Sequence, residues 1–422
     1  MIIYNLFPLL AGRFTDWSPH LVRAAEMEFD WIFVNPIQRP GRSGSIYSIA
    51  DYFDFHPRLI DPTTGARPEA QVHAALAAAH DLGLRAMTDL VVNHSAIDSP
   101  LTIEHPEWYR FEEGHVAHPS CVEDGGRRVV WRDLGQFDHA HSRDREGLHA
   151  YFVRVIEHLL ALGFDGFRCD AAYQIPSEVW RRLIAETRQR HPEVCFVAET
   201  LGCTPDQTRE TARCGFDYVF NSAKYWNFHD HWLMEQYNLI REIVPSIAFP
   251  ESHDTPRLAA ELDGNVDGLK QRYLFAGLFS GGVMAPMGFE FGFRRQPHVV
   301  HTTPEEWETT NIDLSDFIRR VNHVKRSYRV FQEDAPTHIL HYHDPNVLVL
   351  WKGSARSRDE ALIILNKDIW HRHDFWSDSL RDLVQSGAAL TCVSPENPLE
   401  YVHQPFHYEL RPGEAVVLVT QR

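Results

Sequence analysis

Three acidic side chains stand just after short apolar runs of this sequence, where they could carry out chemistry. Asp170 ends "FDGFRCD", Glu199 ends "CFVAE" and Asp254 ends "SIAFPESHD". Cleavage of a glycosidic bond needs such a set, because one carboxylate attacks or stabilises the anomeric carbon while a protonated acid delivers a proton to the leaving oxygen. Alternatively, each acid is only the polar cap of a strand. Several such ends, each with a specific neighbour, favour the chemical interpretation.

The neighbours of two of these acids would set their charge. Arg168 stands two residues before Asp170, and a nearby positive charge favours the ionised form of a carboxyl group. The apolar run 195–198 before Glu199 would act in the opposite direction, because burial disfavours the charged form. The sequence therefore predicts an ionised carboxylate at 170 and a protonated acid at 199.

Eight short apolar segments could position these side chains. They lie at 2–6, 31–35, 84–92, 164–168, 194–198, 216–220, 246–250 and 282–286, with helix-length amphipathic segments such as 68–82, 147–162 and 177–190 between them. Alternating strands and helices indicate a parallel sheet with helices outside, and eight such units predict a closed (β/α)₈ TIM barrel. Because barrel active sites are built at the carboxyl ends of the strands, we expect the three acids on one face.

Two regions depart from this alternation. Residues 95–147 are rich in His, Pro, Gly and charge, which predicts a small inserted domain on the face that carries the acids. After a closing helix at 313–328, short β-type runs separated by turn residues predict an antiparallel β-sandwich. We therefore expect a barrel formed by 1–94 and 148–328, an inserted domain at 95–147 and a C-terminal β domain at 329–422.

Composition excludes several classes of partner. The 422 residues carry a formal net charge of −17, so nucleic acid and anionic membrane surfaces are poor partners. The N-terminal apolar run lacks the basic start and the cleavage site of a signal peptide, and no segment is long enough to span a membrane. The six cysteines form no C-x-x-C pair. These features predict a cytoplasmic protein with reduced thiols.

Four ordered motifs resemble the signature regions of glycoside hydrolase family 13, the α-amylase family. They are "DLVVNH" at 89–94, "GFRCD" at 166–170, "AET" at 198–200 and "SHDT" at 252–255, and "YSIADYFDFHP" at 47–57 resembles the second-strand loop of that family. The resemblance implies a (β/α)₈ barrel, a domain B inserted after the third strand and a C-terminal β domain. The strand pattern predicts each of these parts independently.

The resemblance also implies roles for individual residues. Asp170 would be the nucleophile, Glu199 the general acid/base and Asp254 the carboxylate that holds sugar hydroxyls in the transition state. The implied substrate-binding residues are Tyr47, which would stack beneath the sugar ring, His94, Arg168 and His253. Asp89 is expected to be structural. The implied mechanism is double displacement with retention of the α configuration.

The sequence departs from the family pattern after the nucleophile. Many members carry Lys-His there, which contributes to acceptor binding and a calcium site, whereas this chain has Tyr173 and Gln174. Asn93 matches a calcium-ligand position without its partner, so we expect it to order its loop by hydrogen bonding, and we expect no metal or cofactor. Ser48 replaces the Asp that follows the loop Tyr in exo-acting α-glucosidases, which weakens that interpretation.

Three functions remain open at this point. The first is a retaining hydrolase or transglycosylase that acts on α-glucans or maltooligosaccharides. The second is a maltosyltransferase that uses maltose-1-phosphate as donor and α-1,4-glucan as acceptor, because 6–17, 40–57 and 311–326 resemble that branch. Arg42 could bind an anion in such an enzyme, or could be a solvated turn residue. The third is an inactive barrel that only binds sugar, which the three intact carboxylates argue against.

Overall fold

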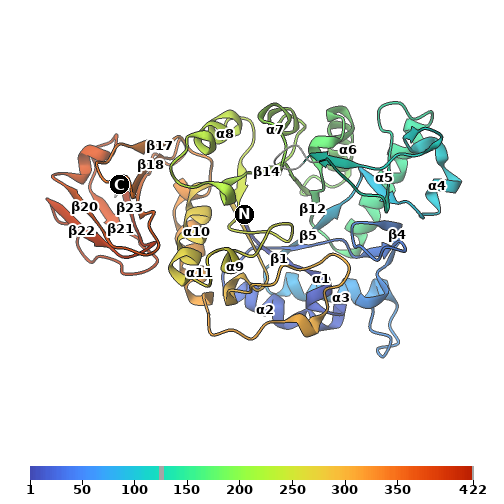
Figure 1. The fold of residues 1–422 in the computed structure, drawn as a ribbon, viewed down its shortest axis with the longest axis horizontal. Helices are drawn as coiled ribbons and strands as arrows, with labels where there is room; N and C mark the ends of the chain where they lie inside the picture. Colours follow the sequence, from blue (N-terminus) through green and yellow to red (C-terminus); the bar gives the residue numbers. More distant parts are fainter. Residues whose placement is uncertain (123–127, 421–422) are drawn as a thin grey trace.

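The computed structural model of the protein describes residues 1–122 and 128–420. Eight parallel strands close into a barrel in the order β1-β16-β15-β14-β13-β12-β5-β2. Figure 1 labels four of them, β1, β5, β12 and β14. The strands are β1 (Ile2–Leu6), β2 (Trp31–Val34), β5 (Arg85–Leu90), β12 (Gly166–Cys169), β13 (Cys195–Ala198), β14 (Tyr218–Phe220), β15 (Ser246–Ala248) and β16 (Gly282–Pro286). This confirms the predicted TIM barrel. Several strands are shorter than the apolar runs that predict them. Val91 and Val92, for example, follow the last paired residue of β5 but are still buried, so apolar character continues beyond the strand.

The barrel is filled by side chains. Ile3, Phe33, Met87, Val197 and Ile247 belong to one buried apolar cluster, to which several strands contribute. Neighbouring residues on the same strands, such as Ile2 and Tyr4 on β1, belong to the larger core that includes the surrounding helices. This alternation follows from the two-residue period of side chains along a strand. The polar residues of interest lie at or just after the carboxyl ends of these strands.

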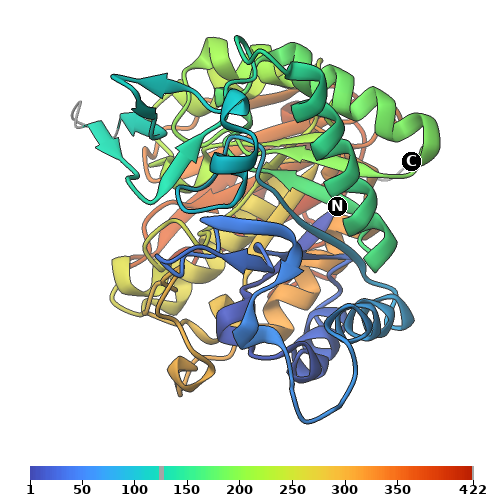
Figure 2. The same ribbon diagram turned by 90° about the vertical axis from the view of Figure 1, so that its right-hand side faces the viewer.

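Helices surround the barrel (Figures 1 and 2). They are α1 (Pro8–Ala11), α2 (Ser18–Glu26), α3 (Pro68–Asp81), α5 (Arg145–Leu162), α6 (Ser177–Arg190), α7 (Pro205–Ala212), α8 (Trp232–Ile240), α9 (Leu258–Glu261), α10 (Val266–Phe279) and α11 (Ser315–Ser327). Helix α5 begins two residues before the predicted start, because the Asp144 side chain caps it by accepting a hydrogen bond from the Gly147 amide. It ends at Leu162, and Gly163, whose positive φ of 109° suits glycine, caps it.

The segment between β5 and α5 consists of short elements, as its composition predicts. These are β6 (His94–Ala96), α4 (Leu101–Glu104), β7 (Phe111–Glu112), β8 (His115–Val116), β9 (Ser120–Val122), β10 (Arg128–Val130) and β11 (Leu134–Gln136). Buried aromatic residues hold the segment together, and the rings of Tyr109 and Phe137 lie 4.7 Å apart. A second ribbon, β3 (Gln38–Pro40) with β4 (Ile49–Phe55), flanks the loop that carries Tyr47.

The C-terminal strands form two antiparallel sheets, which lie at the opposite end of the molecule from the inserted segment (Figure 1). One sheet has the order β17-β18-β19-β23-β21, and the other pairs β20 with β22. The strands are β17 (Thr337–Leu340), β18 (Val347–Gly353), β19 (Glu360–Asn366), β20 (His373–Ser377), β21 (Leu390–Cys392), β22 (Phe406–Leu410) and β23 (Ala415–Thr420). Residues of both sheets, including Val349 and Phe375, share one core, which confirms the predicted sandwich.

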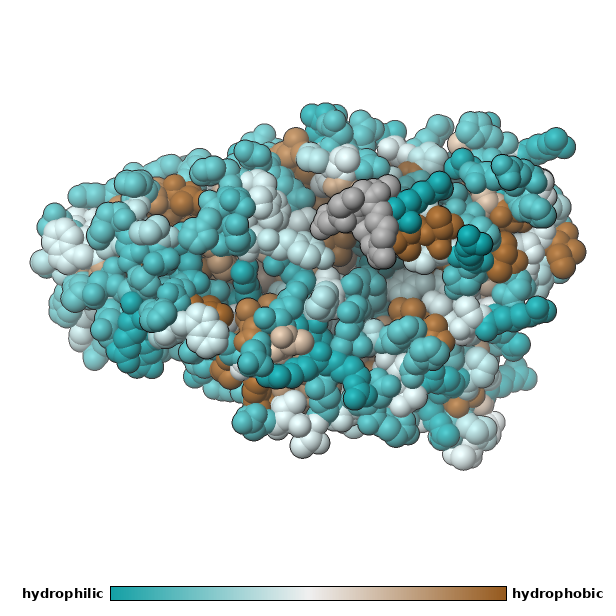
Figure 3. Space-filling model, in the orientation of Figure 1, coloured by the Kyte–Doolittle hydropathy of each residue, from teal (hydrophilic) through white to brown (hydrophobic). Residues whose placement is uncertain are grey.

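The surface in Figure 3 is largely hydrophilic, with apolar residues in small scattered groups. Among the described residues, no helix has the length and apolar character that crossing a membrane requires.

Candidate active site

The barrel brings the predicted site residues together at the carboxyl ends of its strands. Asp89 lies on β5 directly opposite Arg168 of β12, because these two strands pair in parallel register. Asp170 follows β12, and Glu199 follows β13, which pairs with β12. Asp254 comes from the loop after β15. Strands that are far apart in the chain therefore supply one cluster of carboxylates around a single arginine.

Arg168 is the centre of this cluster. Its Nη1 lies 2.7 Å from Oδ1 of Asp170 and 2.7 Å from Oδ1 of Asp89, and its Nη2 lies 3.8 Å from Oδ2 of Asp254. The guanidinium is buried, so water screens these charges weakly. The predicted contact between Arg168 and Asp170 is therefore present.

Glu199 has the opposite environment. Burial raises the pKa of Glu199 to about 7, with Asp170 acting in the same direction and Arg168 against it. Its Oε2 accepts a hydrogen bond from the Ala171 amide at 3.0 Å, and its Oε1 accepts one from the Leu201 amide at 2.6 Å. At neutral pH this carboxyl group is poised between donating and accepting a proton, as a general acid/base requires.

The Ala171 amide reaches Glu199 because the backbone turns sharply after Asp170. Ala171 has φ 43° and ψ 42°, the left-handed conformation that a non-glycine residue rarely adopts. Strained backbone of this kind persists where surrounding contacts hold it, and it clusters at functional sites. Sequence reasoning missed this contact, since nothing in "CDAAYQ" distinguishes Ala171 from an ordinary alanine.

Asp254 is half exposed at the mouth of the site, with 51% of its side chain accessible. Although the surrounding protein desolvates this carboxylate, His253 and Arg168 lower the pKa of Asp254 to about 2. Its Oδ2 lies 3.0 Å from Nε2 of His253. Asp254 is therefore ionised over the whole neutral range.

A buried ion pair that sequence reasoning missed supports this loop. Nη1 of Arg257 lies 2.7 Å from Oε1 of Glu251, and both side chains are 1% exposed. Nη2 of Arg257 also donates to the Met287 carbonyl, and Glu251 accepts a hydrogen bond from the Leu258 amide. The pair brackets His253 and Asp254 in sequence and fixes both ends of their loop.

Tyr47 joins the cluster through its hydroxyl group. Its hydroxyl oxygen lies 2.7 Å from Oδ2 of Asp89 and 2.7 Å from Nε2 of His253, and Asn35 donates a hydrogen bond to it. The Tyr47 and His253 rings are nearly parallel, at 4°. Asp89 is fully buried, and its two carboxylate oxygens accept hydrogen bonds from Tyr47 and Arg168. That Asp89 is structural stays a prediction. Asn35 was missed by sequence reasoning.

Within the site, two buried ring nitrogens have no hydrogen-bond partner among the described residues. They are Nε2 of His94 and Nδ1 of His253. Burial lowers the pKa of His94, so its imidazole is neutral at neutral pH. Buried polar atoms are normally hydrogen-bonded, so these two nitrogens are exceptions within the described structure.

Asn93 orders its loop by a hydrogen bond, as predicted. Its Nδ2 donates to Oε1 of Gln174 at 3.1 Å, so Gln174 and Asn93 bridge the segments after β5 and β12. The described residues hold no group of three or more His, Cys, Asp or Glu side chains arranged for a metal ion. That the enzyme needs no calcium stays a prediction.

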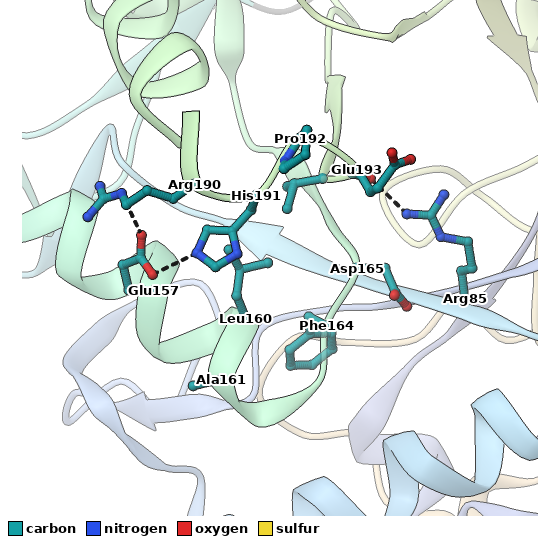
Figure 4. Close-up of a pocket in the computed structure, with 11 residues that line it drawn as sticks. Arg85, Glu157, Leu160, Ala161, Phe164, Asp165, Arg190, His191, Pro192 and Glu193 are labelled. Carbon is teal, nitrogen blue, oxygen red and sulfur yellow. Dashed lines mark hydrogen bonds and ion pairs between the residues drawn. The ribbon is translucent and has the colours of Figure 1, made fainter. Parts of the chain in front are cut away.

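A cavity of about 430 Å³ lies at the opposite end of the barrel (Figure 4). Its lining includes Arg85 at the start of β5 and Asp165 just before β12. Ion pairs of Glu157 with His191 and Arg190 form part of its wall. Because the amino-terminal face of such barrels serves stability, we assign this cavity no part in the chemistry.

Comparisons with known proteins identify relatives in sequence and in fold. Residues 1–114 match the model of a family described as glycogen debranching enzyme, glucanotransferase domain. An α-1,4-glucan:maltose-1-phosphate maltosyltransferase of Burkholderia pseudomallei is 25% identical over 380 residues, which cover 86% of this chain and 32% of that protein. The Mycobacterium tuberculosis (strain H37Rv) protein of the same name is 26% identical over 389 residues, which cover 84% of this chain and 53% of that protein.

The chain thus spans about a third to about half of these relatives. Among solved structures, the maltogenic α-amylase AmyB of Thermotoga neapolitana superimposes with a TM-score of 0.78 at 20% identity, covering 100% of this chain and 99% of that one. This likeness supports the fold. Taken with the four motifs and their meeting at one barrel face, the comparisons confirm the resemblance to glycoside hydrolase family 13, with a particular likeness to its maltosyltransferases.

Proposed function

We propose that the protein is a retaining α-glycoside hydrolase or transglycosylase that acts on α-glucans or maltooligosaccharides. The observation that carries this proposal is the contrast between two neighbouring carboxyl groups. Asp170 pairs with the Arg168 guanidinium at 2.7 Å, whereas burial raises the pKa of Glu199 to about 7. Carboxyl groups whose environments differ in this way divide into a nucleophile and an acid.

The reaction would proceed in two displacements. An oxygen of Asp170 attacks the anomeric carbon while Glu199 protonates the glycosidic oxygen, so the C–O bond to the leaving sugar breaks and a β-glycosyl ester forms. Glu199, now ionised, then removes a proton from water or a sugar hydroxyl, whose oxygen attacks the anomeric carbon and releases Asp170. Two inversions give an α product.

The remaining site residues would bind the reacting sugar. Asp254 is ionised and half exposed, which suits a carboxylate that accepts hydrogen bonds from ring hydroxyls. His94 and His253 each present a buried nitrogen that lacks a partner in the described structure. The Tyr47 ring would lie beneath the sugar. Interactions that strengthen as the sugar distorts raise kcat rather than only lowering KM.

The second candidate is a maltosyltransferase that takes maltose-1-phosphate as donor and α-1,4-glucan as acceptor. The names of the two relatives favour it. The chemistry at Asp170 and Glu199 is the same, and only the leaving group and acceptor differ. Arg42, the residue considered for an anion, is 93% exposed, and its Nε lies 3.5 Å from Asp98. This pairing with a carboxylate weakens Arg42 as a phosphate ligand.

A time course with defined substrates separates these candidates. Maltoheptaose is incubated alone, with inorganic phosphate, and with maltose-1-phosphate, and products are followed by proton NMR and chain-length chromatography. Shorter α-anomeric products without phosphate support a hydrolase. Chains longer than maltoheptaose only with maltose-1-phosphate, or a sugar phosphate only with inorganic phosphate, support the maltosyltransferase. Binding of maltoheptaose without any turnover would overturn both and support a sugar-binding barrel.

A further inference from the structure

We propose that Asn35 is a positioning residue that directs the hydroxyl proton of Tyr47 to Asp89 and so holds His253 in place beside Asp254. Asn35 follows β2, lies outside the four motifs and is fully buried. The inference rests on the proposed function for the catalytic importance of His253 and Asp254.

The orientation of the Asn35 amide is fixed from behind by Asn5. Nδ2 of Asn5 lies 3.0 Å from the Phe33 carbonyl and 2.9 Å from Oδ1 of Asn35. A carbonyl oxygen only accepts hydrogen bonds, so the nitrogen of Asn5 must face it and donates both of its hydrogens. Asn35 therefore turns its oxygen to Asn5 and its nitrogen to Tyr47, whose hydroxyl oxygen is 2.9 Å away.

The Tyr47 hydroxyl has one proton and two lone pairs, and it has three partners. One lone pair accepts the hydrogen from Asn35. Burial raises the pKa of Tyr47 well above its usual range, so the hydroxyl keeps its proton. Asp89, when ionised, only accepts hydrogen bonds, and its Oδ2 lies 2.7 Å away. The Tyr47 hydroxyl therefore donates its hydrogen bond to Asp89. The second lone pair then accepts from Nε2–H of His253.

The donors and acceptors of these three hydrogen bonds are therefore all assigned, and two of the partners, Asp89 and His253, contact the catalytic cluster. His253 carries its proton on Nε2, the nitrogen that lies 3.0 Å from Oδ2 of Asp254. Asp89, which receives the Tyr47 proton on Oδ2, offers its Oδ1 to Arg168. An acceptor in place of the Asn35 nitrogen would compete with Asp89 for the hydrogen bond that the Tyr47 hydroxyl donates. It would weaken the hydrogen bonds of Tyr47 to Asp89 and to His253.

A double-mutant cycle tests whether Asn35 acts through the Tyr47 hydroxyl. Asn35→Ala removes the donor, Asn35→Asp replaces it by an acceptor of the same shape, and Tyr47→Phe removes the hydroxyl. We expect each Asn35 variant to lower kcat on maltoheptaose by about tenfold with little change in KM. In the Tyr47→Phe background, Asn35→Ala should cost less than about twofold more, because coupled residues are not additive.

A matched control comes from a second buried Asn–Tyr pair remote from the site. The Tyr273 hydroxyl donates to Oδ1 of Asn322 at 2.7 Å, and Nδ2 of Asn322 donates to the Met27 carbonyl. Asn322→Ala should lower the thermal midpoint while leaving kcat within about twofold. Fully additive losses for Asn35→Ala and Tyr47→Phe, or full activity of Asn35→Asp, would overturn the inference.

Neutron diffraction from deuterium-exchanged crystals tests the same inference without any turnover. The inference expects the Tyr47 deuteron on the line from its oxygen to Asp89, and a deuteron on Nε2 of His253. A Tyr47 deuteron that points to Asn35 or to His253 would overturn it. Failure of the wild-type protein to turn over any α-glucan would contradict the proposed function instead, so the two failures are distinguishable.

Discussion

One nitrogen atom of Arg168 joins the predicted nucleophile to the fully buried Asp89. Nη1 lies 2.7 Å from an oxygen of Asp170 and 2.7 Å from an oxygen of Asp89. The arginine therefore has two separable roles, which are compensation of a buried charge and orientation of the group that attacks the sugar.

Replacement of Arg168 by Met should separate these roles. The variant leaves Asp89 buried without its cation, which should lower the free energy of unfolding by about 3–5 kcal/mol at pH 7 in urea titrations. Adding Asp89→Asn removes the uncompensated charge and should restore most of this loss, whereas activity stays low because Asp170 still lacks its partner. A double variant as unstable as Arg168→Met would contradict this account.

The pH dependence of activity should follow Glu199. Because its pKa is about 7 and the first step needs the protonated form, kcat/KM on maltoheptaose should fall as the pH rises through about 7. Glu199→Gln should lower kcat/KM by about 10²–10⁴-fold and abolish this basic limb. If the limb persists in the Gln variant, another group is the acid.

The same raised pKa has a cost in stability. Between the unfolded value near 4.5 and the folded value near 7, the folded protein binds more protons at Glu199, so stability falls as the pH rises through this window. From pH 4 to pH 8, the free energy of unfolding of Glu199→Gln should therefore rise relative to that of the wild type by up to about 3 kcal/mol, on top of a pH-independent loss where the Gln nitrogen faces a backbone amide. A difference independent of pH would show that burial of the Glu199 charge is not its cause.

Ala171→Gly should stabilise the protein. Alanine in the left-handed conformation costs about 1 kcal/mol relative to glycine, and the amide that contacts Glu199 is kept. We expect the free energy of unfolding to rise by about that amount with activity retained. Ala172→Gly is the matched control, because Ala172 is buried in an ordinary short helix, and it should destabilise by about 0.5–1 kcal/mol.

The parts of the site that sequence predicts are those fixed by local pattern. Arg168 and Asp170 stand two residues apart at a strand end, so their side chains fall on the same side of the strand, and the apolar run before Glu199 predicts its burial. The contacts of Tyr47 lie beyond such reasoning. They join it to Asp89 and His253, 42 and 206 residues away, and they exist only because the barrel closes.

Two further features of the site could not be predicted from the sequence. The left-handed turn at Ala171 and the Glu251–Arg257 pair depend on the surrounding contacts rather than on residue type. The domain boundaries at 94, 147 and 328 stay predictions, as do the catalytic roles of the individual residues.

The most direct test of the central claim is peptide mapping by mass spectrometry after Glu199→Gln is incubated with α-maltosyl fluoride. Fluoride leaves without a proton, so Asp170 can form its ester with the anomeric carbon, and the missing base should slow hydrolysis of this ester. The account predicts a maltosyl adduct on the peptide that contains Asp170, absent from the Asp170→Asn/Glu199→Gln control. No adduct, or an adduct on another residue, would contradict it.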